Sequence, residues 1–375
     1  MTRVLQITDK GPGGGGIRRV VEAHEKLIGQ TGGTCLRLIL TANPGQGEAP
    51  LDVRSRLPRQ AQVLKALRNA ARGADVIHLH LGFSSVSPDF ISEAASLAPL
   101  VVNLHDVTPF ETLPGWSDPS PANGWRDRLA QRWFLPVRRD LLLRIWHHSS
   151  AIIAPSTYLA ELARNAGAPA NRLWHIPHPV WAAEDPVLPP SRRDPVILYA
   201  GMIAAHKGAP MLLDALAHVK LPTARLRIVG DGPLRPQMER RARRLGMADR
   251  VEFVGQVSAE MVWKELCHAR VLAHPSQIAE GLGLIGIEAL QAMCPVVGFA
   301  TGGAVDWLLH ERTGLRPEPA SPAALGAALE RVLSEDALAD RLGAEGRRLA
   351  IKAFAPARVS EALSACYDQV LGQMA

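Results

Sequence analysis

Short apolar runs alternate with longer helix-like stretches along the chain, and this alternation predicts parallel sheets flanked by helices. In the first half, strands are expected at residues 4–8, 35–40, 76–80, 100–104, 151–154 and 173–176. Helices are expected in most of the gaps, for example over 17–27, 60–72 and 157–165. A chain patterned in this way belongs to the α/β class.

The alternation is interrupted once, at residues 177–193, which hold five prolines and no clear periodicity and are expected to form a linker. Beyond it, strands are expected at 196–200, 226–229, 251–254, 270–273 and 296–299, with helices at 211–218, 234–245, 283–292 and 323–332. The 375 residues are too many for one ordinary domain. We therefore expect two Rossmann-like, doubly wound domains, 1–180 and 190–355, facing a central cleft. A last helix, about 356–375, is expected to pack back on the first domain.

The net charge of +6 narrows the classes of partner. A basic balance suits a phosphorylated substrate, an anionic membrane surface or nucleic acid. The arginines are spread along the chain without a nucleic-acid-binding motif, so we expect no nucleic-acid partner. The four cysteines form no Cys-x-x-Cys pair, the first residues lack a signal-peptide pattern, and no apolar run reaches membrane-spanning length. A cytoplasmic protein with reduced thiols is expected.

A glycine-rich loop follows the first expected strand, from Gly11 through Gly16 with Pro12 as its one other residue. Glycines at a strand-to-helix turn let a ligand approach the backbone, and the amides at a helix start favour an anion. The loop also matches Gly-x-Gly-x-x-Gly, the pattern of dinucleotide-binding oxidoreductases. That class needs an acidic residue after the second strand, where this chain reads Thr41-Ala42-Asn43, so a phosphate-binding loop is favoured over a dinucleotide site.

A second glycine turn carries two carboxylates, in Glu280-Gly281-Leu282-Gly283-Leu284-Ile285-Gly286-Ile287-Glu288. The segment follows a strand and runs into a helix, whose first amides suit a diphosphate. Glu280 precedes this helix, and Glu288 lies about one and a half turns inside it. Carboxylates accept strong hydrogen bonds from hydroxyls, so the pair suits two different hydroxyl-bearing parts of one ligand.

This Glu-x7-Glu segment resembles family 4 of the retaining nucleotide-sugar glycosyltransferases, the group 1 enzymes with the GT-B fold. Further segments along nearly the whole chain are similar to the family's pattern, namely Gly201-Met202-Ile203-Ala204-Ala205-His206-Lys207-Gly208, Val229 to Pro233, Val251 to Val257, Pro295 to Gly303 and Pro155-Ser156. The resemblance implies a hexosyltransferase that uses a UDP- or GDP-sugar and an acceptor that is a saccharide or is lipid-linked, as in polysaccharide biosynthesis.

The resemblance also implies a set of residue roles. Glu280 would contact the hydroxyls of the donor sugar, Lys207 would bind the diphosphate, and His105 would lie near the sugar; these are the catalytic candidates. The implied donor-binding residues are Gly15, Gly16, Gly201, Gln256, Val257, Gly283, Leu284 and Glu288. The chain departs from the family pattern at Met202, where an arginine is usual, and at His178-Pro179, where Asn-Gly is usual.

The resemblance also implies transfer with retention, by same-face attack, in which the leaving phosphate takes the acceptor proton. No Asp-x-Asp occurs, so no metal or other cofactor is expected to be required. His78 and His80 share one face of a strand and are expected to be structural or acceptor-side rather than metal ligands.

Tryptophans and arginines interleave between Trp125 and Trp146, a pattern that suits anionic lipid headgroups and predicts docking on the inner face of the membrane. A solvated helical pair with core aromatics is the alternative interpretation of that segment. Two alternatives to a transferase also stay open. One is a nucleotide-sugar epimerase on the same architecture. The other is a non-catalytic partner subunit, to which the absence of arginine at Met202 points and against which the intact Glu280, Lys207 and Glu288 argue.

Overall fold

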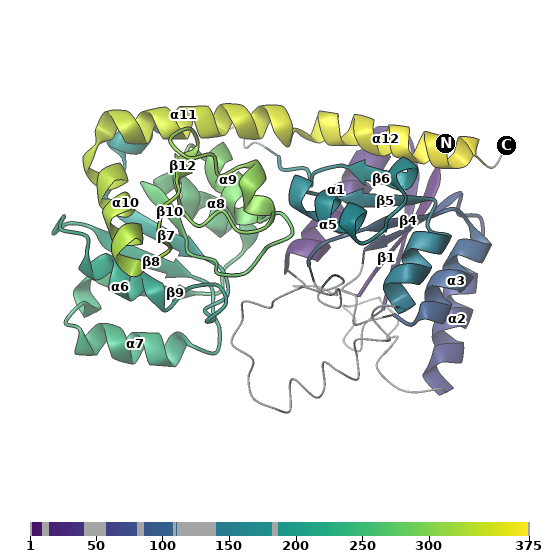
Figure 1. Cartoon of the computed structure of the whole chain (residues 1–375), viewed down its shortest axis with the longest axis horizontal. Coiled ribbons are helices and arrows are strands. Elements are labelled where there is room, and N and C mark those ends of the chain that lie inside the picture. Colours follow the sequence, from purple (N-terminus) through teal and green to yellow (C-terminus); the bar gives the residue numbers. More distant parts are fainter. Residues whose placement is uncertain are drawn as a thin grey trace. The chain divides into compact units, whose positions relative to one another are not determined.

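The computed structural model describes residues 2–9, 15–40, 58–80, 86–107, 110, 140–181 and 187–373 (Figure 1). The chain divides into two compact units. The first comprises Met1–Pro179 together with Pro356–Ala375, and the second comprises Val180–Ala355. Among the described residues, each unit holds one parallel sheet of six strands with helices around it, so the α/β fold of two Rossmann-like halves is confirmed.

The sheet of the first unit has the strand order β2-β1-β3-β4-β5-β6. Its strands are β1 (Arg3–Thr8), β2 (Thr34–Ile39), β3 (Val76–His80), β4 (Leu100–Asn103), β5 (Ala151–Ala154) and β6 (Leu173–His175). Its helices are α1 (Gly15–Gln30), α2 (Pro58–Ala70), α3 (Pro88–Leu97), α5 (Thr157–Asn165) and α12 (Pro356–Gly372), with a 3-10 turn η2 (Ala170–Arg172) and a helical stretch at 140–148.

The two faces of this sheet differ in chemistry. Leu5, Ile7, Ile77 and Leu79 belong to an apolar core that also contains residues of α2, α3 and α5. Because neighbouring residues of a strand point to opposite faces, the intervening positions of β1 and β3 line the other face. These are Gln6, His78 and His80, all buried, and α1 and α12 contribute the side chains that lie against them.

The sheet of the second unit has the order β12-β11-β10-β7-β8-β9. Its strands are β7 (Val196–Ala200), β8 (Arg225–Val229), β9 (Val251–Gly255), β10 (Val271–His274), β11 (Val296–Gly298) and β12 (Gly314–Leu315). Its helices are α6 (Met211–Ala217), α7 (Arg235–Arg244), α8 (Ala259–His268), α9 (Leu284–Gln291), α10 (Pro322–Ser334) and α11 (Asp336–Ala353), with 3-10 turns η3 (Pro190–Arg192), η4 (Ala248–Arg250) and η5 (Gly303–Asp306).

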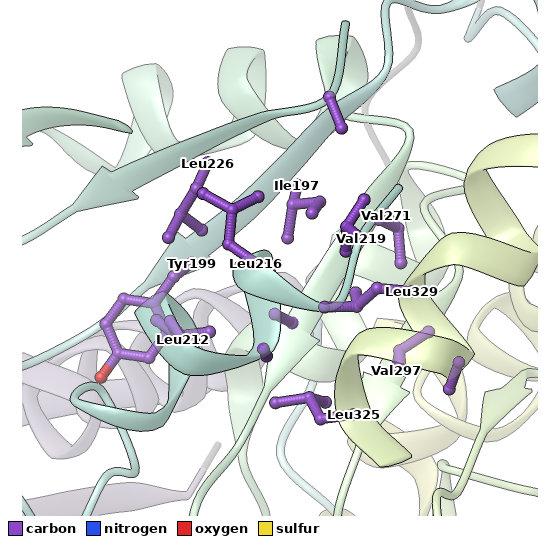
Figure 2. Close-up of a cluster of buried hydrophobic side chains, with 14 of the residues drawn as sticks. Ile197, Tyr199, Leu212, Leu216, Val219, Leu226, Val271, Val297, Leu325 and Leu329 are labelled. Atoms are coloured by element: carbon purple, nitrogen blue, oxygen red, sulfur yellow. The ribbon is translucent and has the colours of Figure 1, made fainter. Parts of the chain in front are cut away.

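Apolar side chains cover both faces of this second sheet. Figure 2 shows one face, where Ile197 and Tyr199 of β7 pack with residues of α6 and α10 such as Leu212 and Leu325. On the other face, Leu198 and Leu272 pack with residues of α8 and α9. Strands buried on both faces are what an all-parallel sheet requires. Their fixed carboxyl ends give the loops that follow them a rigid base.

Every strand expected from the sequence is present, with ends that differ by at most one residue. The short strand β12 was not expected. The proline-rich stretch is not a plain linker at its carboxyl end, because Arg193 is buried and donates hydrogen bonds to the carbonyl oxygens of Leu188, Ala269 and Ala292. Residues 187–193 are thereby anchored to the second unit.

Candidate functional site

Four loops of the second unit leave the carboxyl ends of neighbouring strands. In the sheet order β10-β7-β8-β9, Glu280 follows β10, Lys207 follows β7, Gly230 follows β8 and Gln256 follows β9. All these strands are parallel, so the four loops emerge at one edge of the sheet. In open parallel sheets ligands bind beyond this edge. The sequence-predicted donor residues of the second unit thus gather on one side of it.

Lys207 and Glu280 form an ion pair across this edge. Lys207 Nζ donates to Glu280 Oε1 at 2.9 Å, and the two side chains are 28% and 15% exposed. The loops that carry them are also joined through backbone, because Gln277 N–H donates to the carbonyl oxygen of His206. Gly208 fits this contact only as glycine, since its φ is +69° and a Cβ would lie 1.9 Å from the carbonyl oxygen of Pro275.

The backbone of Glu280 is held from its other side by the turn after β11. Its carbonyl oxygen accepts from Gly303 N–H at 2.8 Å, and Glu280 forms an isolated parallel bridge with Gly302. Gly302 has φ +59°, and a Cβ there would lie 2.4 Å from that same carbonyl oxygen. Glycine is therefore required for this close approach. The turn fixes the place from which the Glu280 side chain extends.

His274 is a third member of this group, and no role was predicted for it from the sequence. Its Nε2 lies 3.7 Å from Glu280 Oε1, and burial lowers the pKa of this imidazole. Burial alone would raise the pKa of Glu280, but the charges of His274 and Lys207, with hydrogen bonds from Lys207 and Ser276, hold it below its usual value. Glu280 is therefore ionised and paired with Lys207 at neutral pH.

Helix α9 begins beside Glu280. Gly283 is its N-cap, in the left-handed conformation with φ +81°, and no side chain among the described residues caps the helix. A Cβ at Gly283 would lie 3.4 Å from Glu280 Oε2 and 3.2 Å from a ring atom of Trp307. The first amides of a helix have no partner within the helix, and the helix dipole favours an anion near them. Gly283 and Leu284 therefore offer an anion-binding end next to Lys207 and Glu280.

Trp307 supports this turn from beneath. Its indole N–H donates to the carbonyl oxygen of Leu282 at 2.6 Å, and its ring lies edge-on to His274, with the ring centroids 5.4 Å apart. Gly286, inside α9, leaves the space for the ring, because a Cβ there would lie 2.0 Å from it. Glu288 lies two residues further along α9 and is buried.

The loop after β7 brings Gly201 and Met202 to the same edge. Gly201 N–H donates to the carbonyl oxygen of Val229, and a Cβ on the neighbouring Gly230 would lie 2.1 Å from the carbonyl oxygen of Gly201. Tyr199 donates its hydroxyl hydrogen to the Met202 carbonyl oxygen at 2.7 Å. Met202 is 52% exposed. An apolar group is thus presented to solvent where the family pattern has a cation.

The two base-side candidates follow β9 directly. The strand ends at Gly255, with φ +89°, whose carbonyl oxygen accepts from Gly230 N–H at 2.7 Å. Gln256 comes next and is exposed, while Val257 is half-buried among residues around α8 and α9. Both lie beyond the carboxyl end of the edge strand β9, on the side of the sheet where Lys207 lies.

The remaining site candidates belong to the first unit. Gly15 and Gly16 are the first residues of α1 and are exposed, whereas Gly11 to Gly14 lie outside the described residues. His105 follows β4 and is half-buried, with its Nε2 3.1 Å from His80 Nδ1. Its ring stacks on that of His178, with the centroids 5.2 Å apart. Their part in one donor site with Lys207 and Glu280 stays a prediction.

The proposed membrane segment Trp125–Trp146 lies outside the described residues up to residue 139. At its end, Trp146 is buried, and its indole N–H donates to the carbonyl oxygen of Ala166. Its ring also packs against Phe110. Trp146 is therefore a core residue and not an exposed membrane anchor. Among the helices that the structure describes, none has the length and apolar character needed to cross a membrane.

Comparison with known families gives two adjoining matches. Residues 37–183 match Glycosyltransferase Family 4, and residues 183–349 match Glycosyl transferases group 1. A curated relative in Mycolicibacterium smegmatis, a GDP-mannose-dependent alpha-(1-6)-phosphatidylinositol monomannoside mannosyltransferase, is 30% identical over 58% of this chain and 62% of its own. The alpha-D-kanosaminyltransferase of Streptomyces kanamyceticus is 28% identical over 47% of this chain and 46% of its own. The chain thus spans about three fifths or less of these relatives' length.

Solved structures share the fold over the whole chain. Sucrose-phosphate synthase from Thermosynechococcus elongatus has a TM-score of 0.77 at 21% identity and full coverage of both chains. HepE of Anabaena, solved with UDP and glucose, has a TM-score of 0.75 at 17% identity, covering 97% of this chain and 99% of its own. At this identity the likeness concerns the GT-B fold alone. The two adjoining family matches, together with the Glu-x7-Glu turn, identify the chain as a member of the group 1, family 4 glycosyltransferases.

Proposed function

We propose that this protein transfers a hexose from a nucleotide-diphosphate sugar to an acceptor hydroxyl with retention of anomeric configuration. The observation that carries the proposal is the Lys207–Glu280 pair at the uncapped start of α9. A cation and a helix N-terminus suit a diphosphate, and an adjacent carboxylate suits sugar hydroxyls. The complex of HepE with UDP and glucose and the GDP-mannose-dependent mycobacterial relative support this class of donor.

Each group would hold one part of the donor. Lys207 and the amides of Gly283 and Leu284 bind the diphosphate, Glu280 accepts from the sugar hydroxyls, and Glu288 accepts from the ribose. Gly201 allows close approach of the ligand, and Gln256 and Val257 border the base. Of the first unit, Gly15 and Gly16 are proposed to contact the diphosphate, and His105 the sugar. Because Met202 stands where an arginine is usual, no guanidinium from this position pairs with the diphosphate. Lys207 therefore neutralises a larger share of the negative charge of the diphosphate.

The proposed reaction breaks the bond between the anomeric carbon and the phosphate oxygen and forms one to the acceptor oxygen on the same face. The leaving phosphate takes the acceptor proton, and the electron pair of the broken bond stays on the nucleoside diphosphate. Lys207 and the α9 amides stabilise the growing negative charge, and in many enzymes such electrostatic stabilisation supplies most of the rate enhancement. The transfer itself needs no divalent cation at the diphosphate.

The acceptor is proposed to be a saccharide or a lipid-linked molecule at the cytoplasmic face of the membrane. The relative that acts on a phosphatidylinositol monomannoside supports a lipid-linked acceptor. Binding to anionic liposomes distinguishes a lipid-linked acceptor from a saccharide acceptor. Flotation at low salt supports the membrane-linked acceptor, and failure to float removes it.

The first test is a thermal-shift screen against UDP, GDP, ADP and TDP and their common sugar conjugates. A ligand that binds the folded state raises the melting temperature by mass action. The proposal expects one nucleotide to raise it, and Glu288→Ala to abolish that rise. No shift with any nucleotide would bring forward the non-catalytic partner subunit.

The second test uses the donor so identified and follows the anomeric signals by NMR. Transfer to an added acceptor with the donor's configuration supports retention. Conversion of the donor to another sugar without any acceptor product would instead establish the epimerase.

A further inference from the structure

Three buried histidines of the first unit meet on the face of the sheet that α1 and α12 cover. His24 lies on the buried face of α1, and His78 and His80 lie two residues apart in β3. None is more than 1% exposed. The ring centroids are 4.1 Å apart for His78 and His80, and 5.4 and 5.2 Å from His24 to each of them.

Four ring nitrogens of this cluster are buried without a hydrogen-bond partner among the described residues. They are both nitrogens of His24, Nε2 of His78 and Nε2 of His80. Buried polar groups in native proteins nearly always have a partner, so such a concentration at one place calls for a ligand. Burial also lowers the pKa of all three, that of His24 to about 4, so each ring is neutral near pH 7. Neutral imidazole is the form that binds metal ions.

The partnered nitrogens of the cluster complete this pattern. His78 Nδ1 lies 2.7 Å from the hydroxyl of Tyr367 in α12, and His80 Nδ1 lies 3.1 Å from His105 Nε2. With the protons on these Nδ1 atoms, Nε2 of both rings carries a free lone pair. Histidines that bind metal ions almost always donate their other ring N–H to a neighbour in this way.

We propose that His24, His78 and His80 bind one transition-metal ion, with Zn²⁺ as the foremost candidate. One nitrogen from each ring lies within 4.8 Å of the other two. A tetrahedral Zn²⁺ with bonds of about 2.0–2.1 Å holds its nitrogens roughly 3.3 Å apart, so small side-chain shifts close the site. Three imidazoles around zinc also occur in carbonic anhydrase. Gln6, the β1 register partner of His78, has a buried Oε1 without a described partner and offers the fourth ligand.

This ion would have a structural role in the first unit. It would join α1 to β3 directly and α12 through the hydrogen bond of Tyr367 to His78. Its ligands belong to the first unit, whereas Lys207 and Glu280 belong to the second. No metal ion is proposed at the diphosphate itself. The sequence offers only His78 and His80 as a pair; the third ligand becomes visible when α1 packs on the sheet.

The test measures metal content and geometry in the untagged full-length protein. Metal-free protein is dialysed against Zn²⁺, and the bound ion is counted by inductively coupled plasma mass spectrometry. About one ion per chain is expected. Co²⁺ in place of Zn²⁺ should give the intense visible d–d bands of a tetrahedral site.

Three variants assign the site. His24→Leu removes a ring that has no described hydrogen bond to lose, and it should weaken binding by more than about 100-fold. Tyr367→Phe removes only the outer partner of His78 and should weaken it by about 10–100-fold. His147→Leu changes an exposed histidine of the same unit and should leave both stoichiometry and affinity unchanged.

Melting temperature provides the second readout. Zn²⁺ should raise the melting temperature of the wild-type protein and of His147→Leu, but not that of His24→Leu, which should remain folded by circular dichroism. The proposal is overturned if the wild type binds no more zinc than His24→Leu does. It is equally overturned if Zn²⁺ leaves the wild-type melting temperature unchanged while His24→Leu melts higher, since the cluster would then be packed core histidines.

Discussion

The Lys207–Glu280 pair allows a double-mutant cycle whose magnitude follows from the structure. The pair combines one hydrogen bond of 2.9 Å with side chains that are 28% and 15% exposed. Hydrogen bonds to charged groups contribute about 1.5–3 kcal/mol, whereas fully exposed ion pairs contribute about 0–1 kcal/mol. For this partly buried pair we expect a coupling free energy of about 1–2 kcal/mol. Lys207→Met alone should be the most destabilising change, because it leaves the Glu280 carboxylate shielded from water and unpaired.

The assay is urea unfolding at pH 7.5 of the wild type, Lys207→Met, Glu280→Gln and the double variant, without ligand. Lys264 and Glu260 on α8 provide a matched control, because their Nζ–Oε1 distance is 2.8 Å but their side chains are 55% and 78% exposed. The control cycle should couple by only about 0.3–0.5 kcal/mol. Additivity of the Lys207 and Glu280 changes within about 0.5 kcal/mol would refute the reasoning, since that is the behaviour of independent sites.

Three further predictions concern the same unit and the reaction. Gly286→Ala should destabilise by about 1–3 kcal/mol in urea unfolding, because its Cβ would overlap the Trp307 ring. Gly29→Ala, whose Cβ would have no described atom within 4 Å, should be neutral or stabilise by up to about 1 kcal/mol. Equal effects of the two changes would contradict the packing argument. Burial depresses the pKa of His274 below 6.5. The contribution of the neutral imidazole to the free energy of unfolding is therefore complete above pH 6.5 and is lost as the pH falls below 6.5. At pH 5.5 the loss of stability is at most about 1.4 kcal/mol. In His274→Gln the urea midpoint should therefore fall less steeply as the pH is lowered. An unchanged dependence of the midpoint on pH would contradict this prediction. Sugar transfer should persist in short assays with excess EDTA, and complete loss restored by Mg²⁺ would show that the reaction needs a metal ion.

Local pattern explains how much of the fold could be predicted. Residues 151–154 and 157–165 match β5 and α5 because an apolar run and a serine-capped amphipathic segment determine their own conformation. The two-residue strand β12 is too short to show the residue pattern by which a strand is predicted from sequence. Arg193 sits in a proline-rich stretch typical of a linker, and only the carbonyl oxygens supplied by distant loops show that it is buried.

The candidate site was predictable only in part. Glu280 and Glu288 are close in sequence, but Lys207 is 73 residues from Glu280, and only the family resemblance linked them. His274 is the last residue of an otherwise apolar strand, so nothing in the neighbouring sequence predicts its contact with Glu280. His24 lies on an amphipathic helix, where a buried histidine looks like any other core position until the sheet beneath is known. Trp146 resembles an exposed aromatic among arginines, and its burial depends on packing against distant residues.

The most direct test of the proposed donor site compares a nucleoside diphosphate with its monophosphate by calorimetric titration. The nucleotide is the one that raises the melting temperature, and the titration is repeated with Lys207→Met. If Lys207 and the start of α9 bind the diphosphate, the wild type should bind the diphosphate at least about tenfold more tightly, a difference of about 1.4 kcal/mol. Lys207→Met should lose most of that difference while its affinity for the monophosphate changes little. An undiminished preference for the diphosphate in Lys207→Met would contradict the account.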